Sequence, residues 1–225
     1  MRVLNTVAEW SPRIDSLQWR AGSCDQIATS ALKYPLLKKL VICGRVDGLS
    51  KLLRACPNLE SLKVVSAANC DDWDAALLAM GQLSHLRELQ LTQSSNPLEK
   101  VQDSCIGKLR SLRSITITNF SNCDSPRISL AALETAHLHG YPVAALLPIL
   151  RTGKSLQTLT LMSIKDLQGS SAASIACVLS ELPSLRSVDI WRSEGRLVLD
   201  SLARTGKWRC PENTRSRATA TRCKR

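Results

Sequence analysis

The chain has 225 residues, of which 44% are hydrophobic, 22% charged and only 4% aromatic. This balance is typical of a folded domain and excludes a disordered or fibrous chain. No apolar run approaches the ~18 residues of a membrane-spanning helix, and residues 1–10 lack the basic start and apolar core of a signal peptide. We therefore expect a cytoplasmic or nuclear protein without a membrane partner.

The formal net charge is +11, and about half of this excess lies in the last residues. We predict that residues 209–225 form a basic, disordered tail. The nine cysteines are scattered and never spaced as metal ligands, so we expect structural thiols, no metal and no cofactor. Two of them, Cys56 and Cys177, fall where a predicted helix should face the core.

One short phrase recurs along the chain, with apolar residues at its first, fourth and sixth positions. The copies start roughly every 21 to 29 residues, a period that is typical of stacked repeats. They are Ile14-Leu17-Trp19, Leu37-Leu40-Ile42, Leu59-Leu62-Val64, Leu86-Leu89-Leu91, Leu112-Ile115-Ile117, Leu133-Ala136-Leu138, Leu156-Leu159-Leu161 and Leu185-Val188-Ile190.

Each copy predicts a strand of about five residues with one buried face, because its fourth and sixth residues lie two apart. Between the strands, apolar spacing predicts helices. In chain order, these helices are indicated by Leu4, Val7 and Ala8; Leu49, Leu52 and Leu53; Trp73, Leu77 and Met80; Val101, Cys105 and Leu109; Val143, Leu146, Leu147 and Leu150; and Ile175, Val178, Leu179 and Leu182. The connection from Thr118 to Leu130 has no helical period, and we expect it to be the loosest.

Prolines and glycines mark where the predicted helices end. Pro12, Pro35, Pro57 and Pro183 each stand two residues before the first position of a copy and stop the preceding helix. Gly153 and Gly206, in the similar segments Arg-Thr-Gly-Lys, are expected to take the left-handed conformation that ends a helix. The repeating unit is therefore strand, turn, helix, turn.

The pattern L-x-x-L-x-L with intervening amphipathic helices resembles the leucine-rich-repeat superfamily, specifically its ribonuclease-inhibitor-like and F-box-associated branch. The resemblance covers roughly residues 4–207 and implies an α/β solenoid of about eight repeats, an open curved parallel sheet with outer helices. We assign residues 1–208 to this domain. Since such a domain needs end caps, we expect either a fragment of a larger repeat protein or ends covered by another chain.

The third, fifth and seventh positions of each copy should form the concave face of that sheet. The candidate partner-binding residues on it are Arg20, Lys39, Lys63, Glu88, Gln90, Thr116, His137, His139, Asp189 and Trp191. We expect Arg20, Lys39 and Lys63 to form a basic corner for an acidic partner, and Trp191 to be an aromatic anchor. A merely solvated face, or a Trp191 covered by the last helix or tail, are the alternatives. His137 and His139 share a face, but no third metal ligand is evident beside them.

These features predict a non-catalytic protein-interaction module with a protein partner and no small-molecule substrate. The resemblance further implies a substrate-recognition part of a ubiquitin-ligase-type assembly. One alternative is an enzyme on an eight-unit βα barrel, although no convincing acid–base set follows the strands. Another is a nucleic-acid-binding protein that uses the basic tail and the Arg20, Lys39 and Lys63 corner.

Overall fold

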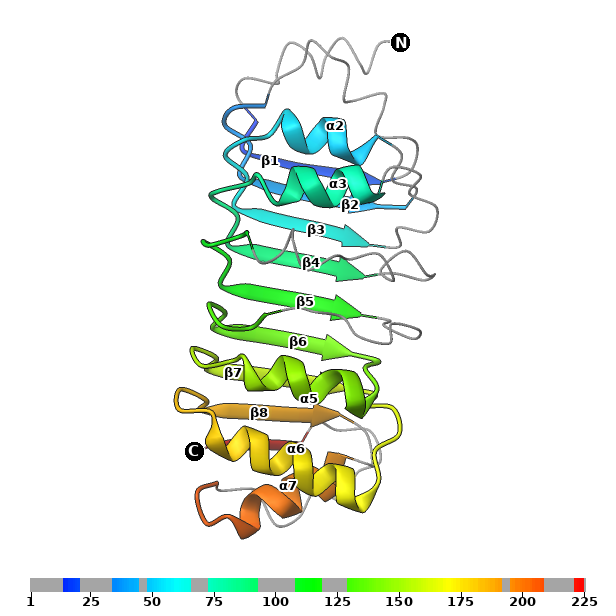
Figure 1. Cartoon of the computed structure of the whole chain (residues 1–225). Helices are drawn as coiled ribbons and strands as arrows, with labels where there is room; N and C mark the ends of the chain where they lie inside the picture. The colour runs from blue at the N-terminus through cyan, green and yellow to red at the C-terminus, as the bar shows by residue number, and fades with distance from the viewer. Residues whose placement is uncertain are drawn as a thin grey trace. The chain divides into compact units, whose positions relative to one another are not determined.

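A computed structural model describes residues 14–20, 34–44, 48–65, 73–92, 108–118, 129–191, 195–208 and 221–224 (Figure 1). The chain divides into two compact units, residues 1–112 and residues 113–225. Both units have the same α/β construction, in which parallel strands follow one another in chain order.

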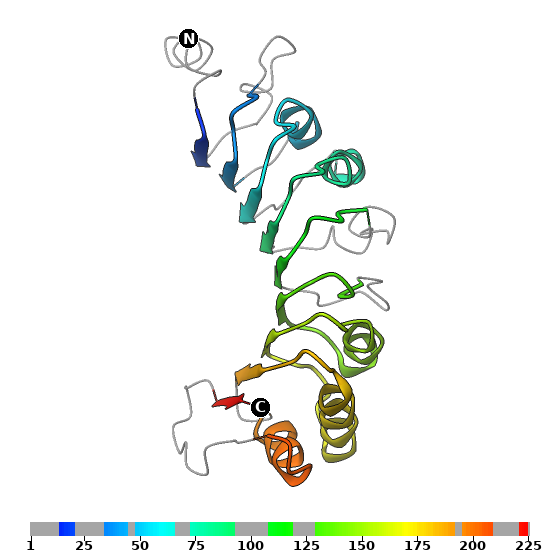
Figure 2. The same ribbon diagram turned by 90° about the vertical axis from the view of Figure 1, so that its left-hand side faces the viewer.

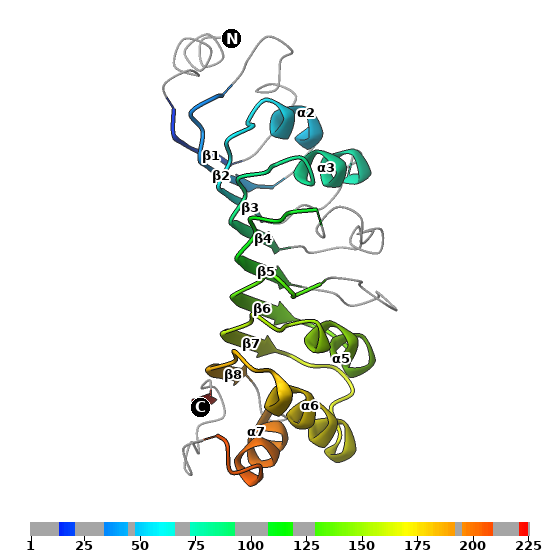
Figure 3. The same cartoon turned by 60° about the vertical axis from the view of Figure 1, so that its left-hand side comes forward.

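The first unit is a parallel sheet with helices on one side. Its neighbouring strands pair residue for residue, so that Leu40 stands opposite Leu17 and Leu62. The helices lie together on one side of the strands (Figure 3). In order, the elements are β1 (Ser16–Arg20), β2 (Lys39–Cys43), α2 (Leu49–Arg54), β3 (Ser61–Val65), α3 (Trp73–Met80) and β4 (Glu88–Thr92).

The second unit repeats this plan and ends differently. Its first four strands pair in parallel, and its helices again lie on one side of them (Figure 2). A last strand pairs antiparallel with β8. In order, the elements are β5 (Ser114–Thr118), β6 (Thr135–His139), α5 (Val143–Arg151), β7 (Thr158–Met162), α6 (Gly169–Glu181), β8 (Ser187–Trp191), α7 (Gly195–Arg204) and β9 (Thr221–Lys224).

The predicted strands and their buried faces are confirmed from β2 to β8. At the fourth and sixth positions of these copies every side chain is at most 2% exposed, including the small Ala136. The first copy differs, because Ile14, Leu17 and Trp19 are only half-buried. The predicted helices around Leu52, Leu77, Leu146 and Ile175 are also present, whereas residues 1–13, Val101, Cys105 and most of the Thr118–Leu130 connection lie outside the described residues.

A further buried position precedes each strand from β2 to β8, and it was not predicted as part of the repeat. Three residues before the first position stand Tyr34, Cys56, Leu83, Leu109, Leu130, Gly153 and Leu182, all of them buried. The carbonyl of this residue accepts a hydrogen bond from the first-position N–H, as between Leu59 and Cys56, and the bond recurs along the chain at 3.0–3.3 Å. The repeating phrase is therefore L-x-x-L-x-x-L-x-L, with a tight turn at its start.

In each unit the second positions of the copies form a column of mostly charged residues at the entrance to the strands. In the first unit it holds Asp15, Lys38, Glu60 and Arg87, and in the second unit Arg113, Glu134, Gln157 and Arg186. Lys38 Nζ lies 3.4 Å from Glu60 Oε1, and Arg113 Nε lies 3.5 Å from Glu134 Oε1. Because these pairs are exposed, each contributes at most about 1 kcal/mol.

The two Arg-Thr-Gly-Lys segments are alike in their threonines and different in their glycines. Thr152 and Thr205 each donate a hydrogen bond at 2.7 Å to the carbonyl three residues earlier. Gly206 has φ of 70°, as predicted, whereas the prediction of a left-handed Gly153 is wrong, because Gly153 is not among the residues with positive φ. Gly153 is instead closely packed: a Cβ there would lie 3.2 Å from the carbonyl oxygen of Leu150.

Two further predictions need correction. Cys56 is buried as expected, but Cys177 is exposed on α6, with its Sγ 3.6 Å from Glu181 Oε1, because it falls one residue off the buried stripe. The prediction that residues 209–225 are disordered is wrong for Thr221–Lys224, which form β9 beside β8. In the described part of the chain, no helix is both long and apolar enough to cross a membrane.

Candidate functional site

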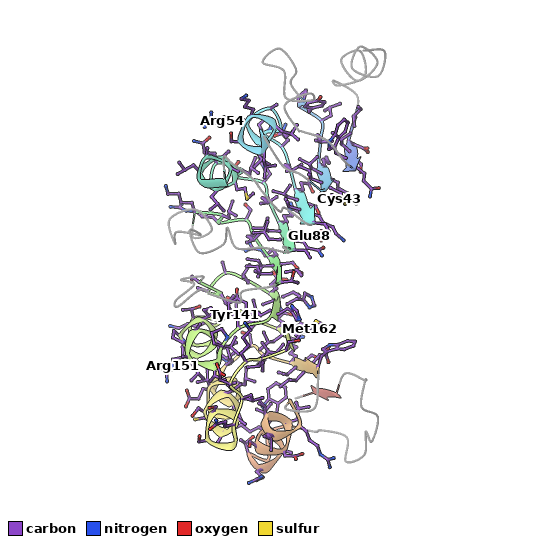
Figure 4. The ribbon with its side chains drawn as sticks, turned by 90° about the vertical axis from the view of Figure 1, so that its right-hand side faces the viewer. Cys43, Arg54, Glu88, Tyr141, Arg151 and Met162 are labelled. Carbon is purple, nitrogen blue, oxygen red and sulfur yellow. The ribbon has the colours of Figure 1, made fainter. Side chains whose placement is uncertain are left out.

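The third, fifth and seventh positions of the strands lie on the face of the sheet that points away from the helices, here called the open face. In the first unit, Cys43 and Glu88 lie on the strand side and Arg54 on the helix side (Figure 4). Lys39 and Glu88 are exposed, and Lys63 and Gln90 are half-buried. The side chain of Arg20 lies outside the described residues.

The strand register separates the three residues of the expected basic corner. Arg20 stands opposite Cys43 at one end of β2, whereas Lys39 stands at the other end. With ~3.3 Å per residue and ~4.8 Å between strands, the backbones of Arg20 and Lys39 are about 14 Å apart across the sheet. Lys39 and Lys63 are diagonal neighbours, about 8 Å apart by the same spacing. The three residues therefore form a triangle with sides of about 8, 12 and 14 Å between their backbones rather than one tight corner. Glu88 stands two strands from Lys39 at the same level.

In the second unit the register brings the other candidates into two rows across β6, β7 and β8. The fifth positions form the row His137, Thr160 and Asp189, which Thr116 of β5 extends. The seventh positions form the row His139, Met162 and Trp191, here called the aromatic row. Met162 lies on the strand side of the unit and Arg151 on the helix side (Figure 4).

The aromatic row combines an exposed indole with a histidine that is held by a hydrogen bond. Trp191 is 39% exposed, although Ile190 beside it in the chain is 2% exposed. Nε2 of His139 lies 2.9 Å from Oγ of Ser163, the residue that follows β7. Polar residues surround the row at the third and fifth positions, so Met162 and Trp191 form an apolar strip on an otherwise polar face.

The loop that follows β7 has an unusual backbone conformation. Ser163 and Asp166 have φ of 52° and 58°, a left-handed conformation that residues other than glycine adopt at a cost. The loop is tied to the end of β6, since the Lys165 N–H donates to the carbonyl of Tyr141 at 2.9 Å and the Gly140 N–H donates to that of Met162 at 2.9 Å. Such conformations gather at binding sites, where the surroundings hold them. Neither Ser163 nor Asp166 was expected as part of a site, and nothing in the local sequence predicts left-handed Ser163.

The electrostatics of the middle row favour a neutral histidine. Burial lowers the pKa of His137 below its usual 6.5, and the negative charge of Asp189 opposes this shift. Thr160, which is 7% exposed, stands between them in the register. A hydroxyl nucleophile, an imidazole base and a carboxylate act as a relay only when the imidazole stands in the middle. The order histidine, threonine, aspartate does not give this relay.

Other reactive groups lie in structural positions. Burial raises the pKa of Cys56 to about 12, and burial together with Cys56 raises the pKa of Tyr34 to about 12. Both groups thus stay protonated and inert at neutral pH. Within the described ranges, no group of three or more His, Cys, Asp and Glu side chains gathers as metal ligands, His137 and His139 included.

A scan against protein-family models gave no match to this chain, and a search of curated proteins found none that matches it.

Proposed function

We propose that the chain is a leucine-rich-repeat solenoid that acts as a non-catalytic protein-interaction module and binds a protein partner on the open face of its sheet. The aromatic row carries this proposal. Tryptophan is enriched among the residues that contribute most to binding energy in protein interfaces, and methionine is enriched in interfaces as well. The hydrogen bond between His139 and Ser163 supports it further, because a side chain already fixed loses less entropy when a partner binds.

The construction of the repeat explains how such a face can be free for binding. The fourth and sixth positions and the turn residue supply the apolar core, so most side chains at the third, fifth and seventh positions stay at least partly exposed, with Thr160 and Ser187 as buried exceptions. Rigid strands then hold these side chains at fixed spacings of about 4.8 Å. This fixed spacing supports recognition of an extended partner surface rather than of a small molecule. As part of the same proposal, we place the protein in the cytoplasm or nucleus.

A paired substitution tests the role of the aromatic row. Trp191→Ala removes the exposed indole, and Leu197→Ala removes a leucine that is 45% exposed on the helix α7 rather than on a strand. A tagged chain and both variants are used to capture proteins from cell extract, followed by quantitative mass spectrometry. Truncation of an interface tryptophan typically costs 2 kcal/mol or more, which corresponds to a loss of affinity of about 30-fold.

We expect partners that are recovered by the unchanged chain and by Leu197→Ala and are lost with Trp191→Ala. Circular dichroism of each variant checks that it is folded. Recovery of the same proteins at the same level with all three chains would contradict a binding role for the open face near β8.

The narrower proposal of a substrate-recognition part of a ubiquitin-ligase-type assembly is supported by the resemblance of the repeat alone. The same capture experiment tests it. Ligase components should be recovered with the Trp191→Ala variant as well, since they would bind elsewhere than the substrate. Captured partners without any ubiquitin-transfer component would contradict it.

The alternative of a βα-barrel enzyme has a structural argument against it in the second unit. A closed barrel requires every strand to have a parallel neighbour on both sides. The outer edge of β8 is instead paired with the antiparallel β9. Small-angle scattering tests this alternative on the whole chain, because an open arc has a larger radius of gyration than a barrel of the same length.

A further inference from the structure

The outer edge of β8 pairs with a strand that does not belong to the repeat. β9 runs antiparallel, whereas β5 to β8 are parallel to one another. Figure 2 shows β9, in red, beside β8 at the end of the strand layer. A further repeat would arrive in parallel after a helix. The edge of β8 therefore accepts an extended segment that is not part of a repeat.

The register of this pair brings opposite charges to the same level. Asp189 stands directly opposite Arg222, and Ser187 stands opposite Lys224. On β5 to β8, Asp189 is the acidic residue of the third, fifth and seventh positions, which otherwise hold Ser, Thr, His, Met and Trp. Opposite charges at directly paired positions favour pairing of two strands, and like charges oppose it. The edge of β8 thus matches a strand with basic residues two positions apart.

We propose that the outer edge of β8 is a strand-addition site for an extended, basic peptide segment of another protein, and that β9 fills this site as a competitor within the chain. Strand addition to an exposed sheet edge is a general mode of peptide recognition, in which main-chain hydrogen bonds supply the affinity. β9 has four residues, so its displacement breaks few backbone hydrogen bonds. This site uses the edge of the sheet and is independent of the proposed role of Trp191 on the open face.

The test uses the full chain and a labelled peptide of residues 217–225, with serine in place of Cys223. In an antiparallel pair, adjacent residues point their N–H groups to opposite sides. The double substitution Arg222→Pro and Cys223→Pro therefore removes at least one hydrogen bond to β8 and opens the edge. We expect the peptide to bind this opened chain at least about tenfold more tightly than the unchanged chain, measured by fluorescence anisotropy, since β9 no longer competes.

Charge recognition is tested in the same opened chain. Asp189→Lys should weaken peptide binding by about tenfold or more. Asp200→Lys is the matched control, because Asp200 is exposed on α7. Its Oδ2 lies 3.7 Å from Nε of Arg196 in the same helix. This control should leave binding unchanged. Trp191→Ala should also leave it unchanged, which separates this site from the open face.

Three results would overturn the proposal. The first is an opened chain that melts like the unchanged one but does not bind the peptide, which would make β9 a fixed cap. The second is equal binding after Asp189→Lys. The third is a dimer of the unchanged chain in sedimentation that disappears in the opened chain, which would identify a second copy as the occupant.

If the opened chain does not fold, hydrogen exchange of the single Asp189→Lys variant replaces it. The amides of Thr221–Lys224 should then lose protection by about tenfold or more relative to the Asp200→Lys variant. Equal protection in the two variants would overturn the charge recognition on which the proposal depends.

Discussion

Replacement of Gly153 with alanine tests the packing at the turn before β7. An added Cβ would lie 3.2 Å from the Leu150 carbonyl oxygen and 3.4 Å from Cβ of Leu156. The Leu150 carbonyl cannot easily move, because it accepts a hydrogen bond from the Gly153 N–H at 2.9 Å. Forcing one extra carbon into a packed site typically costs 1–3 kcal/mol. We therefore expect Gly153→Ala to lower the free energy of unfolding by about 2 kcal/mol.

Two other glycines provide the comparison. Gly169, the first residue of α6, has nothing within 4 Å of an added Cβ. Alanine there should be neutral or stabilise the chain by up to about 1 kcal/mol, since it restricts the unfolded chain and favours the helix. Gly206 also has open space but φ of 70°, so alanine should cost about 1 kcal/mol through the left-handed backbone alone.

Urea unfolding of the three variants, followed by circular dichroism, measures these differences. The expected order of stability is Gly169→Ala, then the unchanged chain, then Gly206→Ala, then Gly153→Ala. If Gly153→Ala were as stable as Gly169→Ala to within about 0.5 kcal/mol, the turn would have room for a side chain. The interpretation of the turn residue as a tightly packed position of the repeat would then be wrong.

Three further outcomes are expected. Glu134→Ala should lower the free energy of unfolding by less than about 1 kcal/mol, and by less still at high salt, because the ion pair with Arg113 is exposed; urea unfolding at two salt concentrations checks this. Stability should fall as the pH drops below 6.5, because the lowered pKa of His137 means that the unfolded chain takes up a proton first; thermal melting of His137→Gln should show a weaker dependence in that range. Iodoacetamide should modify the exposed Cys177 in the folded chain and Cys56 only after denaturation, since burial raises the pKa of Cys56 to about 12; peptide mapping by mass spectrometry distinguishes the two.

The strands could be predicted from the sequence because their signal depends on a period of two residues and is repeated. Leu40 and Ile42, or Leu159 and Leu161, point the same way only on a strand, and each copy supports the others. Cys177 shows the limit of the corresponding argument for helices. A rotation of about 100° per residue makes the boundary of a buried helical stripe ambiguous by one position. The thiol was assigned to the core, although its neighbours Ala176 and Val178 are the buried residues.

The turn residue was missed because its members vary more than those of the strand positions. Four are leucine, but Tyr34, Cys56 and Gly153 fill the same position with very different volumes. What they share is a carbonyl that accepts a hydrogen bond from the first-position N–H. Because any residue type has this carbonyl, the bond cannot be recognised from the sequence. The prolines that follow this position at Pro35, Pro57 and Pro183 were noticed, but they mark the turn only where they occur.

Candidate binding residues could be assigned to a face but not to a cluster. Alternation along a strand places Arg20, Lys39 and Lys63 on the same side of the sheet. Only the register between strands decides which of them are neighbours, and it places Arg20 level with Cys43 rather than with Lys39. In the same way, the row His139, Met162 and Trp191 follows from the register of β6, β7 and β8. Distances between strands are set by pairing, which a single sequence does not report.

The core positions and the open-face positions of the strands should respond differently to substitution. The core positions are occupied by leucine-like residues in copy after copy, because each must fill the same space against the next strand. Most open-face positions do not have to fill such a space, and they vary from lysine and glutamate in the first unit to histidine, methionine and tryptophan in the second. Substitutions at the fourth and sixth positions therefore report on stability. Substitutions at exposed third, fifth and seventh positions report on recognition, whereas the buried Thr160 and Ser187 and the half-buried His137 also affect stability. Trp191 extends from a strand into solvent, and the two kinds of effect can be separated most cleanly there.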